Sequence, residues 1–261
     1  MQNQIVQSWV EVPVPGETVP MSAYLARPAA PGSYPNVLVS FEMFGLTGYV
    51  RAVTDRIARL GYTAVAPDFY HRSGNRIALP ATPAGRERGL ELLQRMDRDG
   101  VRHDMQALLD YLPERADGSD RTAMVGMSSG GHLAYYVATQ FPLAAVAVFY
   151  PGWLTDTTIA LSRPEPTLTL TSGMAKHGNR LLFLVGDGDH LFTAEHHDQI
   201  TTRLRDAGVN HELIVYPDTP HGFFCHERDT YRAAAAEDAF ARVTALLADE
   251  IPPRRPGRAG R

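Results

Sequence analysis

Short apolar runs alternate with amphipathic segments along most of the chain. Residues 5–14 and 21–27 alternate apolar and polar positions around a turn at Pro15-Gly16-Glu17, which predicts a hairpin. Largely apolar runs, typical of strands buried on both faces, follow at 36–41, 63–66, 122–125, 144–149, 181–185 and 212–216. Such strands, separated by helices, predict an α/β fold with a mostly parallel sheet covered on both faces.

Helices are predicted between these strands. In 48–60 the apolar residues recur at helical spacing, and Gly61 is well suited to end the helix. Similar patterns predict a helix directly after Gly131 and further helices at 84–96, 100–112, 194–207 and 231–249. Residues 71–83 are rich in Gly, Pro, Ser and Asn, which predicts a long loop.

One domain accounts for nearly the whole chain. We assign 1–250 to it, because 261 residues with an apolar fraction of 44% suit a single large α/β domain. Residues 151–179 lack clear periodicity, and an irregular segment of this length is typical of a lid or a binding loop. The basic tail, 251–261, is expected to be disordered.

Composition restricts the partners of the protein. A net charge of −4 gives no electrostatic reason to expect nucleic acid or an anionic membrane, and no apolar run reaches the roughly 18 residues that span a bilayer. The N-terminus lacks the features of a signal peptide, and one cysteine, Cys225, fits a reducing compartment. We therefore expect a cytoplasmic protein, a monomer or homodimer, that acts on a small molecule. No cofactor or metal is expected, because His196-His197-Asp198 lacks further ligands at helical spacing.

A candidate catalytic residue lies in the stretch Gly126-Met127-Ser128-Ser129-Gly130-Gly131. It follows a buried strand and precedes a helix, and a G-x-S-x-G sequence in that setting is typical of a nucleophile elbow. The turn is so tight that its flanking residues must be small, a condition that Gly126 and Gly130 meet, while Gly131 lets the helix pack close to the sheet. We predict that Ser128 is a catalytic nucleophile.

A serine alcohol is a weak nucleophile, so it needs a base within hydrogen-bond reach and an acid that orients the base. After Ser128, the order of acid and then histidine is met by Asp189 and His221, each just past a predicted strand. His221 is favoured among the ten histidines because a flanking proline and glycine fix a turn directly after the last strand. Asp187 competes with Asp189 as the acid.

Further candidates follow other strands. The carboxyl ends of parallel strands meet at one edge of a sheet, and Glu42 and Asp68 also come just after predicted strands. The oxyanion of a tetrahedral intermediate needs two aimed N–H donors, which would be the amides of Ser129 and Met43. Glu42 stands where an acid is unfavourable unless it is paired or functional.

The chain resembles the dienelactone hydrolase (carboxymethylenebutenolidase) family of the α/β-hydrolase fold. The matching stretches run in family order between residues 5 and 249, and the resemblance implies Asp189 and His221 as triad members, Met43 as an oxyanion donor and Glu42 as a buried acid beside the nucleophile. These stretches are Phe41-Glu42-Met43-Phe44-Gly45, the G-Y-x-x-x-x-P-D-x-Y block at 61–70, the elbow at 126–131, Gly186-Asp187-Gly188-Asp189-His190 and His221-Gly222-Phe223.

The chain departs from this family at the nucleophile and in one loop. The family usually has cysteine where this chain has Ser128, so Glu42 could orient Ser128, bind a substrate hydroxyl, or serve as an added acid or base. The segment 151–179 also looks longer than in short members of the family.

A third departure concerns the substrate. Cys225 stands where the family has an arginine that holds the substrate carboxylate, and Arg228 is nearby but out of register. A second family arginine could correspond to Arg86 or Arg88. These differences favour a neutral or weakly polar ester. The candidate substrate contacts are Phe44, Tyr70, Arg86, Tyr150 and Trp153.

We therefore expect a serine hydrolase that cleaves an ester or lactone through an acyl-enzyme. The alternative is a lyase, cyclase or acyltransferase on the same fold, with acid–base chemistry by His221 and Glu42, which the serine and the longer loop motivate. A binding module with a decayed site is disfavoured, because no member of the triad is missing.

Overall fold

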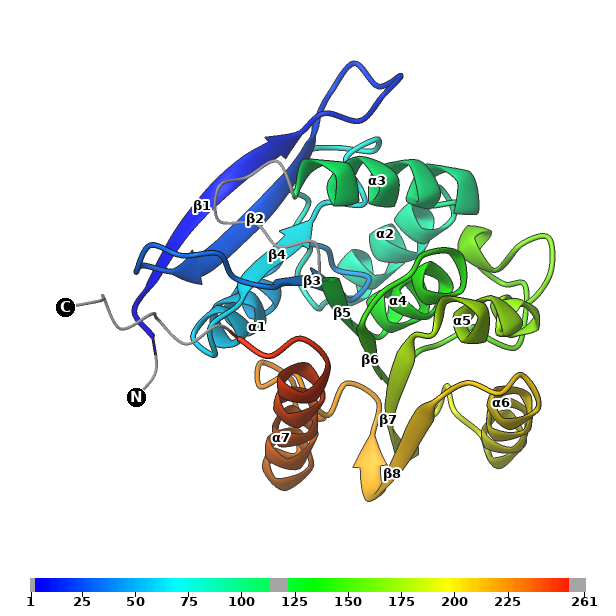
Figure 1. Cartoon of the computed structure of the whole chain (residues 1–261). Helices are drawn as coiled ribbons and strands as arrows, with labels where there is room; N and C mark the ends of the chain where they lie inside the picture. The colour runs from blue at the N-terminus through cyan, green and yellow to red at the C-terminus, as the bar shows by residue number, and fades with distance from the viewer. Residues whose placement is uncertain (1–2, 113–121, 254–261) are drawn as a thin grey trace.

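Eight strands form one sheet in the part of the chain that the computed structural model describes, residues 3–112 and 122–253. They are β1 (Ile5–Val12), β2 (Met21–Pro28), β3 (Asn36–Ser40), β4 (Thr63–Pro67), β5 (Thr122–Met127), β6 (Ala145–Phe149), β7 (Arg180–Gly188) and β8 (His211–Pro220). Their order across the sheet is β1-β2-β4-β3-β5-β6-β7-β8 (Figure 1). Among the described strands only β2 runs against the others, since it is antiparallel to both of its neighbours, β1 and β4.

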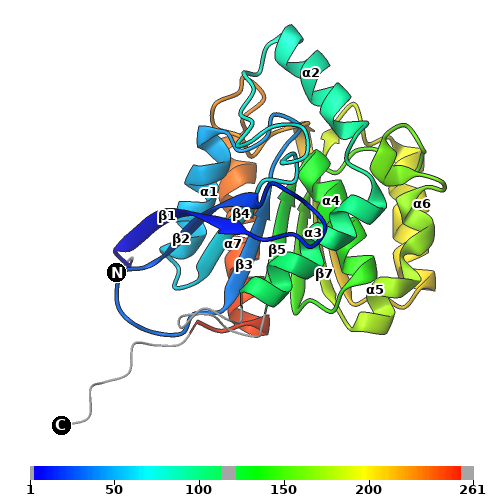
Figure 2. The ribbon, with the colours of Figure 1, turned by 90° about the horizontal axis from the view of Figure 1, so that it is seen from above.

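Helices cover both faces of this sheet. They are α1 (Gly48–Ala58), α2 (Pro83–Leu93), α3 (Arg98–Tyr111), α4 (Ser129–Gln140), α5 (Ser172–His177), α6 (Ala194–Asp206) and α7 (Ala233–Glu250). Helices α1 and α7 lie on one face and α3 to α6 on the other, while α2 projects beyond one end of the sheet (Figures 1 and 2). Because the central strands are covered on both sides, every residue of β3, β4, β5 and β6 is buried, as their apolar runs predict.

Strand register determines which residues meet at the carboxyl edge. Ser40 of β3 pairs with Gly126 of β5. Glu42 lies two residues after Ser40 and Ser128 lies two residues after Gly126, so both are at the same level of the sheet. Gly188 of β7 pairs with Pro220 of β8, so Asp189 and His221 each follow directly. The parallel strands therefore deliver these four side chains to the same edge of the sheet.

Strands β7 and β8 run further than their apolar patterns predict. The register shifts between Gly186 and Gly188, and Gly188 then pairs with Pro220, past the ends of the apolar runs. Gly186 permits this close pairing, because a Cβ there would lie 1.8 Å from the carbonyl oxygen of Thr219.

The segment 151–179 contains helices that its sequence does not reveal. These are the 3-10 helices η1 (Ala160–Ser162) and η2 (Thr167–Leu170), followed by α5. None is long enough to show a helical repeat, which explains the missing periodicity. Of the predicted disordered tail, residues 254–261 lie outside the described part of the chain. Within the described ranges, no helix combines the length and apolarity needed to cross a bilayer.

Candidate active site

The turn between β5 and α4 places Ser128 at a strained apex. Ser128 has φ of 54° and ψ of −118°, outside the regions that L-residues favour. The glycines two residues before and two residues after Ser128 have no room for side chains. A Cβ on Gly126 would lie 2.0 Å from the carbonyl oxygen of Gly130, and a Cβ on Gly130 would lie 2.3 Å from that of Phe41. The small residues of the G-x-S-x-G sequence are therefore required by backbone contacts.

Two hydrogen bonds join Ser128, His221 and Asp189. The Oγ of Ser128 lies 3.0 Å from Nε2 of His221, and Nδ1 of His221 lies 2.9 Å from Oδ2 of Asp189. Because a carboxylate only accepts, Nδ1 carries the proton and Nε2 can accept one from the serine. The Leu191 amide donates to the other oxygen of Asp189 at 2.8 Å and holds the carboxylate in place. Asp187, the competing acid, is exposed at the end of β7.

Glu42 is buried beside this hydrogen-bonded chain and is paired. It is 4% exposed, it accepts a hydrogen bond from the guanidinium of Arg228, and the Tyr150 hydroxyl donates to its other oxygen at 3.4 Å. Burial raises the pKa of Glu42, while the charges of Arg228 and His221 and the Tyr150 hydroxyl oppose that rise. The partner that a buried acid requires is thus Arg228.

Arg228 reaches the site because the chain after His221 folds into consecutive turns. The amide of Cys225 donates to the carbonyl of Gly222, and the amide of Arg228 donates to that of Cys225, at 3.0 and 3.1 Å. These turns bring the Arg228 guanidinium carbon to 5.0 Å from the ring centroid of Phe44. Arg228, which the sequence places out of register with the family's arginine, is therefore paired with Glu42 at the site.

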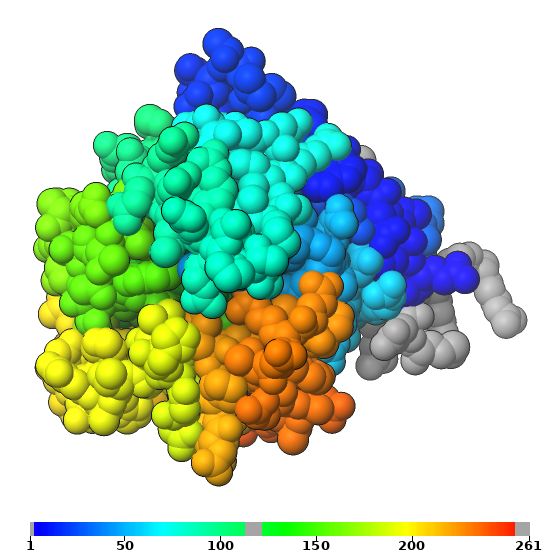
Figure 3. All heavy atoms as spheres, turned by 180° about the vertical axis from the view of Figure 1, so that it is seen from behind, coloured from blue at the N-terminus to red at the C-terminus, as the bar shows by residue number. Residues whose placement is uncertain are grey.

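A cavity of about 320 Å³ opens over Ser128. Figure 3 shows the face of the molecule where three parts of the chain come together, around residues 70–95, 190 and 220–230. The lining residues are Met43, Phe44, Arg86, Leu90, Ser128, Trp153, Thr158, His190, Leu191, His221 and Arg228. Three of the predicted substrate contacts, Phe44, Arg86 and Trp153, are among them. The alternative arginine, Arg88, pairs instead with Glu91 on the surface of α2.

Two other predicted substrate contacts do not line this cavity. Tyr70 is 2% exposed and donates its hydroxyl to the carbonyl oxygen of Met43 at 3.2 Å, so it holds the backbone at Met43 from inside the protein. Tyr150 is fully buried, and its ring centroid lies 5.0 Å from that of His221. In this structure both tyrosines contact site residues from inside the protein, and their predicted contact with substrate gains no support from the lining of this cavity.

Asp68 also lies apart from the site, although it follows a strand. Its carboxylate is fully buried and accepts hydrogen bonds from the backbone amides of Tyr70 at 3.1 Å and Arg76 at 2.6 Å. Burial raises the pKa of Asp68 to about 6, against the effect of these two amides. Asp68 thus follows β4 at the carboxyl edge of the sheet, but its hydrogen bonds organise the loop after β4 and do not join it to Ser128.

Met43, which carries one of the proposed oxyanion donors, lines the same cavity as Ser128, and Ser129, which carries the other, follows Ser128 in the chain. Met43 is in a turn closed by a hydrogen bond from the Gly45 amide to the Glu42 carbonyl at 2.9 Å. Ser129 begins α4, where backbone N–H groups and the helix dipole favour a negative charge. The Ser129 hydroxyl donates to the carbonyl of Phe41 at 3.5 Å, which links the helix start to the strand that leads into Met43.

Several residues of the cavity are not among the candidates that the sequence suggests. His190 lies next to the triad, with Nδ1 4.0 Å from Oδ1 of Asp189, and its ring centroid lies 5.5 Å from that of His221. Leu191 follows it in the chain. Leu90 is 38% exposed, and an apolar residue on the outer face of a predicted helix is a signal that could have identified it.

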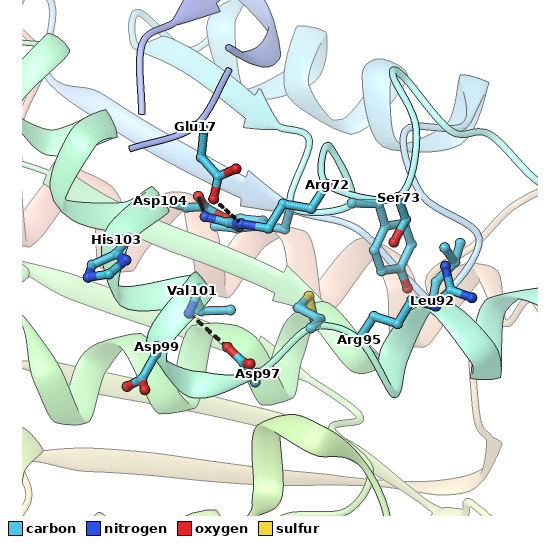
Figure 4. A pocket seen from close by; sticks show the side chains of 14 residues that line it. Glu17, Arg72, Ser73, Leu92, Arg95, Asp97, Asp99, Val101, His103 and Asp104 are labelled. Carbon is cyan, nitrogen blue, oxygen red and sulfur yellow. Dashed lines mark hydrogen bonds and ion pairs between the residues drawn. The ribbon is translucent and has the colours of Figure 1, made fainter. Parts of the chain in front are cut away.

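A second cavity, of about 250 Å³, lies beside α3 and the loop after β4 (Figure 4). Arg72 joins Glu17 and the buried Asp104 by ion pairs at its wall, at 2.6 and 2.8 Å. Ser128, His221 and Asp189 are not among its lining residues. Across the described residues, no group of three or more histidine, cysteine, aspartate or glutamate side chains has the arrangement of a metal site.

Comparisons with known proteins agree on one family. The family model described as the dienelactone hydrolase family matches residues 21–251. A Synechocystis sp. protein provisionally named carboxymethylenebutenolidase is 32% identical over 92% of this chain and 96% of its own length. A Bradyrhizobium sp. protein provisionally named 2-oxo-3-(5-oxofuran-2-ylidene)propanoate lactonase is 29% identical over 93% of this chain and 94% of its own length.

Solved structures agree on the fold. A crystal structure from Klebsiella pneumoniae, titled as a provisional dienelactone hydrolase, superposes with a TM-score of 0.83 at 27% identity, over 94% of this chain and 99% of the other. The predicted α/β-hydrolase fold is confirmed.

Proposed function

The chain belongs to the dienelactone hydrolase family, and on that premise we propose that it is a serine hydrolase that opens a lactone or cleaves an ester through an acyl-enzyme. The observation that carries the proposal is the continuous hydrogen-bonded chain from Ser128 through His221 to Asp189, at 3.0 and 2.9 Å, beneath an open cavity. A serine so placed has the base and the orienting acid that it needs as a nucleophile.

The reaction has two halves. Ser128 Oγ attacks the carbonyl carbon while Nε2 of His221 takes its proton, and the amides of Met43 and Ser129 stabilise the oxyanion. His221 then gives the proton to the departing alkoxide oxygen, and the C–O bond breaks to leave an acyl-serine. A water molecule, deprotonated by His221, attacks the acyl-serine; the bond from the acyl carbon to Oγ of Ser128 then breaks, His221 returns the proton to Oγ, and the acid is released. Asp189 stabilises the imidazolium in both halves.

The cavity favours a substrate with a carboxylate. Arg86 and Arg228 both line the space over Ser128, next to the apolar side chains of Leu90 and Trp153. The names of the two relatives each describe a lactone that carries a carboxyl group. Arginine suits a carboxylate because its planar fork donates two parallel hydrogen bonds. We therefore favour an unsaturated lactone or ester with an anionic substituent over the neutral ester that the sequence suggested.

Labelling with a fluorophosphonate tests the nucleophile. Ser128→Ala should abolish covalent labelling and lower ester turnover by roughly 10⁴-fold or more, because the residual activity would come from binding and the oxyanion site alone. Cys225→Ser is the matched control and should be labelled normally, since burial raises the pKa of that thiol to about 12.

Two outcomes would contradict the proposal. Labelling that persists in Ser128→Ala would mean that another residue is the nucleophile. The lyase or transferase alternative would be favoured if a carbonyl substrate is turned over without incorporation of oxygen from labelled water and if this turnover does not require Ser128.

A further inference from the structure

His132 links the nucleophile helix to the segment that forms one wall of the cavity. It lies in the first turn of α4, and its amide donates to the carbonyl of Ser128 at 3.0 Å. Its side chain is fully buried, with Nδ1 2.9 Å from the carbonyl oxygen of Gly152 and Nε2 2.7 Å from Oγ1 of Thr167. Because a carbonyl only accepts, Nδ1 carries the proton, and Nε2 accepts one from the Thr167 hydroxyl.

The backbone that His132 holds is strained on both sides of Gly152. Tyr150 has φ of 37° and Trp153 has φ of 57°, and both values are unfavourable for residues with a Cβ. Residues persist in such conformations only where the surroundings hold them. The hydrogen bond from His132 to Gly152 falls between the two strained residues, where it can restrain the backbone on either side.

Both strained residues contribute to the site. Trp153 lines the cavity over Ser128. Tyr150 packs against the ring of His221 and donates its hydroxyl to Glu42. A shift of the turn at 150–153 would therefore move one wall of the cavity and two supports of the catalytic groups together.

We propose that His132 is a positioning residue that fixes the turn 150–153 and thereby determines which acyl groups fit beside Trp153, an inference that rests on the proposed function. His132 reaches no reacting atom itself. It acts through one donor, Nδ1–H, on one carbonyl, that of Gly152. A variant that loses this hydrogen bond should therefore change in substrate selectivity, whereas a variant that only loses folding stability should not.

A second buried contact between the same two elements provides the control. The hydroxyl of Tyr135 on α4 lies 2.6 Å from Oγ1 of Thr171, and both residues are fully buried. This contact holds a later part of the same segment, and neither residue lines the cavity over Ser128. Tyr135→Phe removes this hydrogen bond with little change in side-chain shape. It therefore measures how the loss of a buried hydrogen bond between these two elements affects stability and selectivity.

Two amide substitutions separate the two hydrogen bonds of His132. In His132→Asn the amide nitrogen takes the place of Nδ1 and can still donate to Gly152. In His132→Gln the amide lies where Nε2 was, so the bond to Thr167 can be kept while the donor to Gly152 is lost. The measurement is the ratio of kcat/KM for p-nitrophenyl phenylacetate to that for p-nitrophenyl acetate, together with the thermal midpoint of each variant.

His132→Gln should change this ratio by about 10-fold, mainly through KM, since small displacements of a positioning group have effects of this size or larger. His132→Asn should stay within about 3-fold of the parent, and Tyr135→Phe should lower only the thermal midpoint. The inference is overturned if both amide variants change the ratio equally, if neither does, or if Tyr135→Phe reproduces the change.

Tryptophan fluorescence gives a readout that does not depend on activity. The chain has two tryptophans, so Trp9→Phe leaves Trp153 as the only one. In that background, His132→Gln should increase quenching of Trp153 by acrylamide, and His132→Asn should not; equal quenching in both would contradict the inference. A parent enzyme that turns over neither ester and is not labelled by a fluorophosphonate would instead refute the proposed function, whatever the fluorescence shows.

Discussion

Arg228 has two roles that compete for the same guanidinium. It pairs with the buried Glu42, and it lines the cavity where a substrate carboxylate would lie. An unpaired carboxylate is unfavourable in a buried position, so removing Arg228 alone affects both folding and binding. A substitution at Arg228 is therefore informative only when the charge of Glu42 is controlled.

The double variant Arg228→Met with Glu42→Gln should fold, because neither buried charge is left unpaired. We expect KM for a carboxylate-bearing lactone to rise roughly 10- to 100-fold, the size of a lost charge-assisted hydrogen bond. KM for a neutral ester of similar size should change by less than about 3-fold. Steady-state kinetics on both substrates check this, and equal losses for the two would contradict a carboxylate-binding role.

At the scale of elements, the join of β5 and α4 has little room for larger residues. Gly130 contacts the backbone of Phe41, so α4 packs directly on the strand that leads into Met43. The two proposed oxyanion donors belong to these two elements. Their separation is therefore set by the lack of a side chain at Gly130.

Gly130→Ala should lower kcat as well as stability. The added Cβ would lie 2.3 Å from the Phe41 carbonyl oxygen, and neither backbone can move without separating the oxyanion donors. We expect a loss of about 2 kcal/mol or more in the free energy of unfolding. Gly208→Asn is the control, because Gly208 has φ of +69° with nothing within 4 Å of an added Cβ, and it should lose less than about 1 kcal/mol. Urea unfolding and the rate of fluorophosphonate labelling are the measurements, and similar losses in both variants would argue against the packing explanation.

At the scale of the whole molecule, the buried His132 links stability to pH. Burial lowers the pKa of His132 from 6.5 to about 4, so the folded protein keeps it neutral where the unfolded chain would protonate it. Between these two pKa values the unfolded state binds more protons. Stability is therefore full above pH 6.5 and falls as the pH drops towards 4.

The contribution of His132 to this fall is on the order of 3 kcal/mol across the window. His132→Asn cannot titrate there, so its free energy of unfolding should depend less on pH between 6.5 and 4 than that of the parent. Urea unfolding at several pH values measures both slopes. The comparison between the two proteins removes the shared effect of the carboxylates, and identical slopes would show that His132 is not the group responsible.

The sequence by itself determined the features that depend on residues close together in the chain. Apolar runs such as 122–125 mark buried strands because every position is covered, and the glycines around Ser128 mark a turn that admits no side chain. The order of strands and turns then placed Asp189 and His221 just past strand ends. Such patterns are local, so they can be recognised without knowing how the elements pack.

Only the tertiary structure decided which distant residues meet. Arg228 pairs with Glu42 across 186 positions of the chain, because consecutive turns bring it back over the site. Asp68 and Tyr70 have favourable sequence positions, yet their polar atoms are used to hold a loop and the Met43 carbonyl. The function of each such group depends on which partner satisfies its hydrogen bonds, and that choice is made by the packing of the folded chain.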